Sequence, residues 1–239
     1  MQDLTLLIAY TLGAGACIPL GGALASVERI RRNWLENEFR HFVIAFGGGV
    51  LLAAVAFVLV PQGAGYVGAP WGSVLALLAG GGAFFALERF LAARRQDKPQ
   101  FSAMLLDYVP ESLALGGAFA LGAASAPLLA LFIGLQNLPE GFNAYREMMR
   151  ADGADKRRIL QSMCLLVPLG PLLALFGWAV LKEHVTLLGT IMLFASGGIL
   201  YLIFQDIAPQ SRMQRHWAPS LGAVFGFGLG MLGTMLDAG

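Results

Sequence analysis

Two short motifs place acidic and amide side chains beside a proline in otherwise apolar sequence. The first is Asp107-Tyr-Val-Pro-Glu111 and the second is Gln136-Asn-Leu-Pro-Glu140, so the spacing of the two polar ends is the same. Residues four apart lie on one face of a helix, and each motif therefore presents two oxygen-bearing side chains together. Carboxylate and amide oxygens are ligands that hard and borderline divalent cations accept. The motifs predict cation binding.

The prolines add two further oxygen atoms. Pro110 and Pro139 have no N–H to donate, which frees the carbonyls of Leu106 and Leu135 four residues earlier. In an apolar environment a freed carbonyl must be satisfied by protein, water or an ion. These two carbonyls are therefore additional candidate ligands.

The surroundings of the acidic residues exclude an ordinary ion pair. Asp107, Glu111 and Glu140 lie in long apolar segments, where an ionised side chain costs on the order of 3 kcal/mol. No Lys or Arg occurs at comparable depth in the sequence. Protonation, water or a bound cation must compensate these carboxyls. Their repetition on two motifs favours the cation, and the alternative is a protonated carboxyl that donates a hydrogen bond between two helices.

The segments around the motifs predict a membrane protein. Of the 239 residues 57% are hydrophobic and 13% charged, and the mean hydropathy is +0.67. Such a chain has little polar surface to present to water. About 20 apolar residues in a helix cross the hydrocarbon of a bilayer. We expect an all-α membrane protein with eight transmembrane helices in a single domain, 1–239, with spans near 3–26, 40–61, 70–93, 102–123, 127–146, 159–181, 185–208 and 218–236.

Basic residues gather on one side of the predicted bundle. The connections after the first, third, fifth and seventh spans hold 15 of the 16 Lys and Arg residues, and only Lys182 lies on the other side. The positive-inside rule makes these connections cytoplasmic and places both termini outside, in a multi-pass protein of the cell (inner or plasma) membrane. This topogenic role explains the basic loops better than nucleic-acid binding does. The first residues lack a basic n-region, so we expect the first span to be retained.

Segments 47–62 and 196–210 are alike, since each opens on small residues and closes on Pro-Gln. They belong to the second and seventh spans, which cross in opposite directions, and so they indicate an inverted-topology repeat of the kind that transporters use. The remaining glycines predict close helix packing: Gly80, Gly81, Gly82, Gly116, Gly117, Gly226, Gly228 and Gly230.

With these features the sequence resembles the ZIP family of divalent metal transporters, whose fourth and fifth spans carry His-Asn-x-Pro-Glu-Gly-like motifs. The two motifs extended to Ser112 and Gly141 occupy those places. The resemblance implies an inverted-repeat bundle that moves divalent cations of the Zn, Fe, Mn and Cd class toward the cytoplasm by alternating access. It also implies a metal site between the fourth and fifth helices, formed by Asp107, Glu111, Gln136 and Glu140. The metal is the substrate, and no cofactor is implied.

Departures from the family pattern change the expected site. The usual motif histidines are Asp107 and Gln136 here, so the shell is rich in oxygen, which predicts a shift toward Mn²⁺, Fe²⁺ or Cd²⁺ rather than strict Zn²⁺ preference. Family members often carry a second metal position, and the corresponding residues are Tyr108, Asn137 and Val167. We therefore expect a single site. Tyr108 either gates it or fills the vacated position.

Several other residues keep two interpretations. Asn137, with Asn143, is either a metal ligand or an interhelical hydrogen-bond partner, and Asp206 either receives metal at the inner end or is a solvated helix end. Histidines at span ends are expected to anchor the interface, and cysteines within spans are expected to be small buried hydrophobes rather than a disulfide: His41, His184, His216, Cys17 and Cys164.

Two other functions remain open for the same residues. The chain can be a degenerate ZIP-like protein that acts as a metal sensor, or a proton pathway without metal transport. An intramembrane enzyme is disfavoured because the sequence has no HExxH pattern and no Ser–His pair at depth. We therefore expect no enzymatic activity. The expected partners are the lipid bilayer and a divalent cation, without nucleic acid, and a homodimer is left open.

Overall fold

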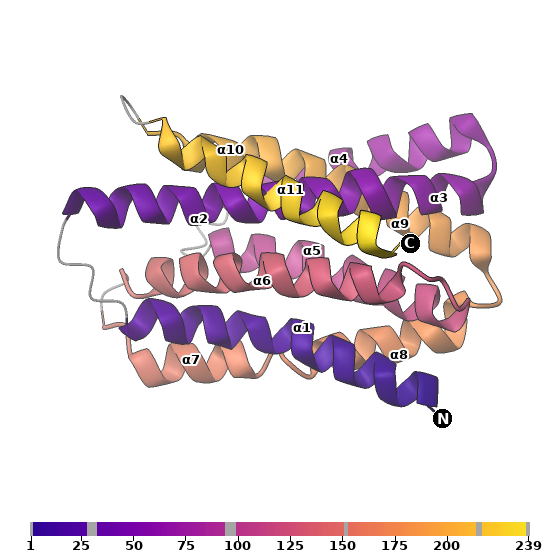
Figure 1. Ribbon diagram of the computed structural model, residues 1–239, viewed down its shortest axis with the longest axis horizontal. Helices are drawn as coiled ribbons and strands as arrows, with labels where there is room; N and C mark the ends of the chain where they lie inside the picture. The colour runs from indigo at the N-terminus through magenta and orange to yellow at the C-terminus, as the bar shows by residue number, and fades with distance from the viewer. Residues whose placement is uncertain (1, 28–32, 94–98, 151–152, 214–216, 238–239) are drawn as a thin grey trace.

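The computed structural model describes residues 2–27, 33–93, 99–150, 153–213 and 217–237. The described elements are helices that run roughly along the longest axis of the molecule (Figure 1). They are α1 (Gln2–Val27), α2 (Asn33–Ala54), the π-helix η1 (Val55–Leu59), α3 (Val60–Val67), α4 (Pro70–Ala93), α5 (Pro99–Ala120), α6 (Ala126–Met148), α7 (Lys156–Cys164), α8 (Leu169–Leu181), α9 (Val185–Leu202), the π-helix η2 (Ile203–Ile207), α10 (Ala208–Ser211) and α11 (Ala218–Asp237).

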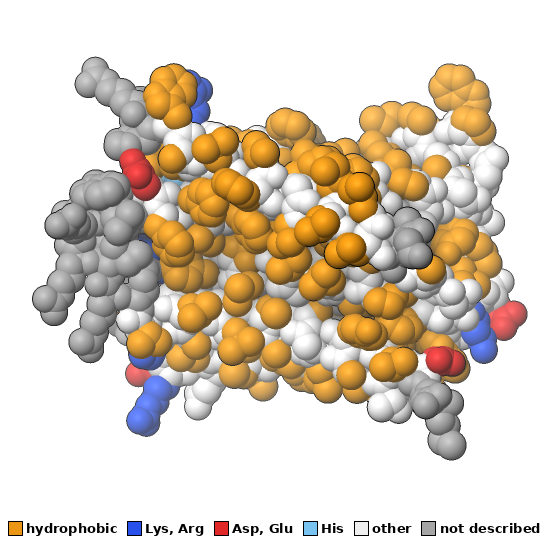
Figure 2. Space-filling model, viewed as in Figure 1, with side chains coloured by type: hydrophobic (Ala, Val, Ile, Leu, Met, Phe, Trp, Pro, Cys, Tyr) orange, Lys and Arg blue, Asp and Glu red, His pale blue; other side chains and the backbone are white. Residues whose placement is uncertain are grey.

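Six helical stretches of the described chain are long and apolar enough to cross a membrane: Asp3–Val27, Glu38–Val67, Pro70–Phe90, Lys156–Leu181, Val185–Ser211 and Ala218–Leu236. Apolar side chains also cover the middle of the visible face, whereas charged side chains lie at its two ends (Figure 2). The protein is therefore an all-α, multi-pass membrane protein. Helices α5 and α6 overlap the predicted ranges 102–123 and 127–146, but neither is among these six stretches.

The helices pack in four main pairs, and two of these pairs contain the motif-bearing helices α5 and α6. Helix α1 packs along α6 and α5 along α8, while α2 packs along α11 and α4 along α9. Contacts of α2 with α6 and of α5 with α9 join the two halves. In Figure 1, α1, α7 and α8 lie below α5 and α6, and α2, α4 and α11 lie above them. The two motif-bearing helices are thus the central layer of the bundle.

Glycines on both partners allow each of the four main pairs to approach closely. A Cβ at Gly141 of α6 would lie 2.2 Å from the carbonyl oxygen of Ile18 in α1, and one at Gly21 of α1 would lie 2.1 Å from that of Leu138. Only glycine permits these backbone contacts. The other pairs use Gly116 and Gly177, Gly80 and Gly197, and Gly49 and Gly226 in the same way. The packing prediction is confirmed for Gly80, Gly116 and Gly226, whereas Gly82 and Gly228 have no described atom within 4 Å of such a Cβ.

The rods α2–η1–α3 and α9–η2–α10 each contain a π-helix just before a proline. Helix η1 ends two residues before Pro61, and η2 ends two residues before Pro209. The N–H that follows each π-helix donates to a carbonyl five residues earlier instead of four. Proline lacks an N–H and crowds the carbonyl four residues before it, which favours this local widening. The two π-helices fall in the two segments, 47–62 and 196–210, that are alike in sequence.

The predicted span 159–181 is two helices rather than one. Helix α7 ends at Cys164 and α8 begins at Leu169, after Pro168. Tight bonds that reach back three residues, from the N–H of Val167 to Cys164 at 3.2 Å and from Leu169 to Leu166 at 3.0 Å, form the turn between them. Because proline has no N–H, the α-helical bond pattern cannot continue through this position.

Both termini lie at one end of the bundle, together with the connections 68–69, 121–125 and 182–184 (Figure 1). The end of α6 with Arg146 and the start of α7 with Lys156 lie at the opposite end. Many of the basic residues counted in the sequence fall in 28–32, 94–98 and 214–216, outside the described residues. The arrangement of the described ends is the one expected for an even number of crossings.

Candidate functional site

Helices α5 and α6 bring the two motifs together in the interior. Asp107 and Glu111 are 3% and 0% exposed on successive turns of α5, and Gln136 and Glu140 are 0% and 7% exposed on successive turns of α6. Both helices continue through the proline inside the motif. Each pair therefore shares a helix face, as the spacing predicts, and the two faces meet.

The polar side chains form contacts across the two helices. Gln136 Nε2 donates a hydrogen bond to Glu111 Oε2 at 2.6 Å. The carboxyl groups of Asp107 and Glu140 also lie within hydrogen-bonding range of each other. The two contacts stack as neighbouring rungs between antiparallel helices, so the four predicted ligands form one polar layer inside the apolar bundle.

Several oxygen atoms of this layer and of the neighbouring Asn137 have no hydrogen-bond partner among the described residues: Asp107 Oδ1, Glu111 Oε1, Gln136 Oε1, Asn137 Oδ1 and Glu140 Oε2. A buried acceptor without a partner costs about 1–3 kcal/mol, and more when it is charged. Five such acceptors on two adjacent helices therefore need protons, water or a cation. An arrangement with surplus acceptors suits a positively charged ligand.

The three carboxyl groups do not converge on one point: Asp107 meets Glu140, whereas Glu111 meets the amide of Gln136. Among the described residues, no group of three or more His, Cys, Asp or Glu side chains is placed to hold a metal ion by itself. In this conformation a cation beside Glu111 would therefore use amide oxygen, that of Gln136, as part of its ligand set. The site fits a hard or borderline cation in the chemistry of its donors, with fewer carboxylates on any one ion than the sequence predicts.

Asn137 and Asn143 extend the polar surface of α6. Asn137 is fully buried, and its Nδ2 donates to the carbonyl oxygen of Ala14 in α1 at 2.9 Å. The interhelical hydrogen bond is thus one observed role of Asn137, while its buried Oδ1 has no described hydrogen-bond partner. Asn143, one turn beyond Glu140, is also buried with a partnerless Oδ1 among the described atoms. A ligand role for either residue stays a prediction.

The residues at the expected second metal position surround one turn of α1. A Cβ at Gly15 would lie 2.6 Å from the hydroxyl oxygen of Tyr108 and 3.1 Å from the carbonyl oxygen of Val167, and Asn137 reaches the adjacent Ala14. The Tyr108 ring is 1% exposed, and its hydroxyl also abuts Gly170 of α8. Two glycines thus make room for the phenol. This geometry favours the interpretation in which Tyr108 fills the position.

A second polar cluster was not predicted. Glu88 of α4 accepts a hydrogen bond from the Tyr201 hydroxyl and one from Gln205 Nε2 at 3.4 Å. Asp206, within η2, interacts electrostatically with Glu88 rather than with α5 or α6. The criterion that singled out Asp107, an acidic residue inside a predicted span, also applies to Glu88 in 70–93. It was missed because Glu88 lies beside Arg89 near the end of that span.

Among the described residues, no histidine or cysteine joins acidic side chains in a group that could hold a metal ion. Cys17 and Cys164 are free, and Cys17 Sγ donates to the carbonyl of Gly13 at 3.4 Å. The prediction of burial is wrong for Cys164, which is exposed at the end of α7, where the chain turns. His184 is exposed in the connection 182–184, and His41 is half-buried in α2. His216 lies outside the described residues.

The chain matches no protein-family model and no curated protein sequence. The resemblance to ZIP transporters therefore rests on the two motifs and on the helices that carry them, and the function must be argued from the chemistry of the polar layer.

Proposed function

We propose that this protein transports divalent metal cations of the Zn, Fe, Mn and Cd class across the cell membrane, toward the cytoplasm, through the layer between α5 and α6. The observation that carries the proposal is the cluster of buried carboxyl and amide oxygens without described partners, in motifs that contain no Lys or Arg. Intramembrane acidic residues of this kind mark ion pathways. The proposed ligands are Asp107, Glu111, Gln136, Glu140 and Asn137.

In this proposal α5 and α6 cross the membrane as well, which gives eight crossings. They run alongside α1, α2, α8 and α9, each of which belongs to an apolar stretch long enough to span. Polar residues in a crossing helix are tolerated when they face the bundle interior, and α6 is buried along most of its length. The end that bears most of the Lys and Arg residues is then cytoplasmic, and the termini are outside.

The helix pairing supports an inverted repeat. Exchanging α1 with α8, α2 with α9, α4 with α11 and α5 with α6 turns the pair α1–α6 into α8–α5, and the pair α2–α11 into α9–α4. The π-helices η1 and η2 also exchange, each two residues before its proline. Transporters with this symmetry alternate access by moving one bundle against another around a fixed site.

Helices α2 and α6 pack closely beside the second motif, and a glycine lies at their contact. Helix α2 meets α6 at Gly47, whose Cβ would lie 3.0 Å from Cγ of Pro139. Pro139 immediately precedes Glu140, so a movement of α6 along α2 carries a proposed ligand with it. Small residues at such a joint permit the helices to slide.

One alternative is favoured by a specific observation. The carboxyl groups of Asp107 and Glu140 lie within hydrogen-bonding range of each other, and two buried carboxyl groups so placed can share a proton. Because no three carboxylates converge among the described residues, a proton pathway without metal transport is the second candidate.

The test is uptake of a panel of divalent metals into proteoliposomes, with Glu111→Gln and Glu140→Gln beside the wild type. Glu111→Gln keeps an oxygen that can accept the Gln136 hydrogen bond and removes only the charge. The matched control is Glu183→Gln, in the exposed connection 182–184. We expect each site variant to lose metal flux by about tenfold or more, and the control to keep it.

The remaining outcomes distinguish metal transport from a proton pathway. Equal metal flux in the wild type and both site variants would refute the proposed site. Proton flux without metal flux, measured with a pH-sensitive dye in the same vesicles, would establish the proton pathway instead. Metal-dependent thermal stabilisation of the wild type but not of Glu111→Gln would link binding to the layer, since a ligand that binds only the folded state raises its stability.

A further inference from the structure

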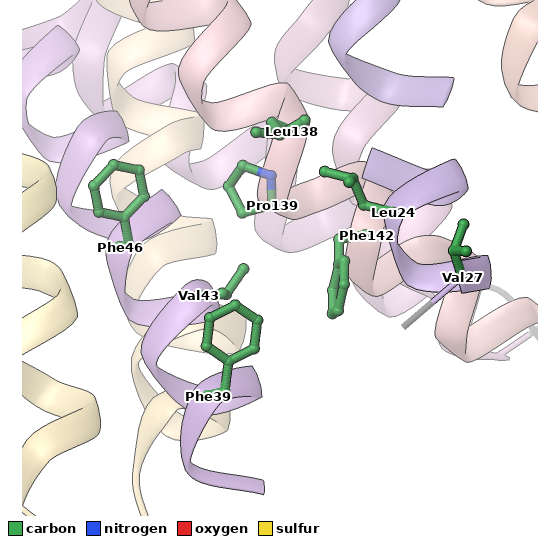
Figure 3. A pocket seen from close by; sticks show the side chains of 8 residues that line it. All are labelled: Leu24, Val27, Phe39, Val43, Phe46, Leu138, Pro139 and Phe142. Atoms are coloured by element: carbon green, nitrogen blue, oxygen red, sulfur yellow. The ribbon is translucent and has the colours of Figure 1, made fainter. Parts of the chain in front are cut away.

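An apolar groove opens between α1, α2 and α6 near the end of the bundle that is opposite the termini (Figure 3). Its volume is about 500 Å³, and its eight lining residues are all apolar. The last turn of α1, residues 39–46 of α2 and the middle of α6 contribute the walls. In Figure 3 the side chains of Phe39, Val43 and Phe46 on α2 lie on one side of the opening, and those of Leu24 and Val27 on α1 lie on the other.

The mouth of the groove lies on the outer surface of the bundle. Leu24, Val27 and Phe39 are 56%, 69% and 44% exposed. A space of this volume lies in the usual range for ligand pockets, about 300–1,000 Å³. Water does not stably fill an apolar cavity. In a bilayer, the group available to fill an apolar groove that opens to lipid is the acyl chain of a lipid.

A basic side chain lies beside the groove. The guanidinium of Arg146 is 5.7 Å from the ring centroid of Phe142, and Phe142 lines the groove. In sequence, the segments 27–40 and 146–158, which follow α1 and the end of α6, together hold nine Lys and Arg residues against six Asp and Glu residues. Basic residues close to the surface attract anionic headgroups. Charge complementarity therefore selects an anionic lipid over a zwitterionic one.

We propose that the groove binds one anionic phospholipid, with an acyl chain between α1, α2 and α6 and the phosphate beside Arg146. This lipid contacts α6 and α1 on one side and α2 on the other. Pro139 forms part of its wall and immediately precedes Glu140. The bound lipid therefore touches the outer face of the helix that carries two of the polar-layer residues. The inference does not depend on metal transport.

The test is native mass spectrometry of the protein in mild detergent, after equilibration with phosphatidylglycerol or with phosphatidylcholine of the same acyl chains. We expect one retained phosphatidylglycerol per chain. Leu24→Trp fills the groove and should abolish retention, whereas Leu75→Trp, on the exposed face of α4, should not. Both replace an exposed leucine, and unchanged thermal unfolding shows that each variant folds.

A second pair of variants tests the headgroup. Arg146→Gln should reduce the preference for phosphatidylglycerol over phosphatidylcholine by about fivefold, the effect of one basic residue near an anionic surface. Arg150→Gln, exposed beyond the end of α6, should leave the preference unchanged. The proposal is overturned if the wild type retains no lipid, if the two tryptophan variants lose lipid equally, or if the two headgroups are retained alike. A dimer that Leu24→Trp converts to monomer would instead assign the groove to a second copy of the chain.

Discussion

Replacing Gly141 by alanine tests whether backbone contact between α1 and α6 sets the geometry of the polar layer. The new Cβ would lie 2.2 Å from the carbonyl oxygen of Ile18, which is 0.8 Å short of the 3.0 Å below which real Cβ atoms essentially never approach. The obstacle is backbone, so no side-chain rotation relieves it. Helices α1 and α6 must separate, and Glu140, the preceding residue, shifts with α6 relative to Asp107 on α5.

The cost follows from two opposing effects. Overpacking of this kind costs about 1–3 kcal/mol, and a rigid obstacle places it near the upper value. Replacing a helical glycine by alanine returns about 1 kcal/mol of helix propensity. The net destabilisation is about 2 kcal/mol. For a chain of this length that corresponds to a decrease of about 4–8 °C in the unfolding temperature.

The assay is thermal unfolding in detergent, followed by circular dichroism, with Gly228→Ala as the control. Gly228 is also helical, but no described atom lies within 4 Å of the place that its Cβ would take, so alanine there should be neutral or stabilise by up to about 1 kcal/mol. Metal-dependent stabilisation should fall in Gly141→Ala and persist in the control. Equal unfolding temperatures for the two variants would refute the packing argument.

Three further substitutions test the site. Gly170→Ala would place a Cβ 2.1 Å from the hydroxyl oxygen of Tyr108 and should lower the unfolding temperature. Adding Tyr108→Phe removes that oxygen and leaves the ring carbon Cζ at 3.1 Å, so it should restore most of the lost unfolding temperature. If the double variant unfolds at the same temperature as Gly170→Ala, the close fit of the Tyr108 hydroxyl against Gly170 is contradicted. Asn137→Leu removes the bond to Ala14 and should cost about 1–3 kcal/mol in metal-free unfolding; an unchanged unfolding temperature would contradict a structural role. Gln136→His adds an imidazole and should raise the Zn²⁺ to Mn²⁺ ratio of apparent affinities in thermal-shift titrations; an unchanged ratio would mean that residue 136 does not touch the cation.

Apolar run length predicts where the helices are, and it does so well. The expected span 70–93 coincides with α4, Pro70–Ala93, and the expected 218–236 lies within α11. The reason is that hydrophobic length reports on contact with lipid, which each helix makes independently of its partners. The four-residue spacing of the motifs is equally local, and it places Asp107 and Glu111 on one face of α5 as predicted.

The sequence did not predict which side chains form contacts between different helices. The choice of Gln136 for Glu111, of Glu140 for Asp107 and of Ala14 for Asn137 depends on how helices distant in sequence come to lie side by side. A single sequence without a packing arrangement contains no local signal for such pairs. The pairing explains why the carboxylates do not form the single cluster that the motifs suggest.

The π-helices also alter which face each rod presents. A helix advances about 100° per residue, so one extra residue in a turn rotates everything beyond it by that amount. Before η1, α2 faces α6 and α11; after it, α3 faces α9. The same happens in the other rod, where α9 faces α4 before η2 and α10 faces α2 after it. A helical wheel drawn through either rod at constant pitch is therefore out of phase beyond the π-helix, and substitutions chosen from it would reach the wrong neighbour.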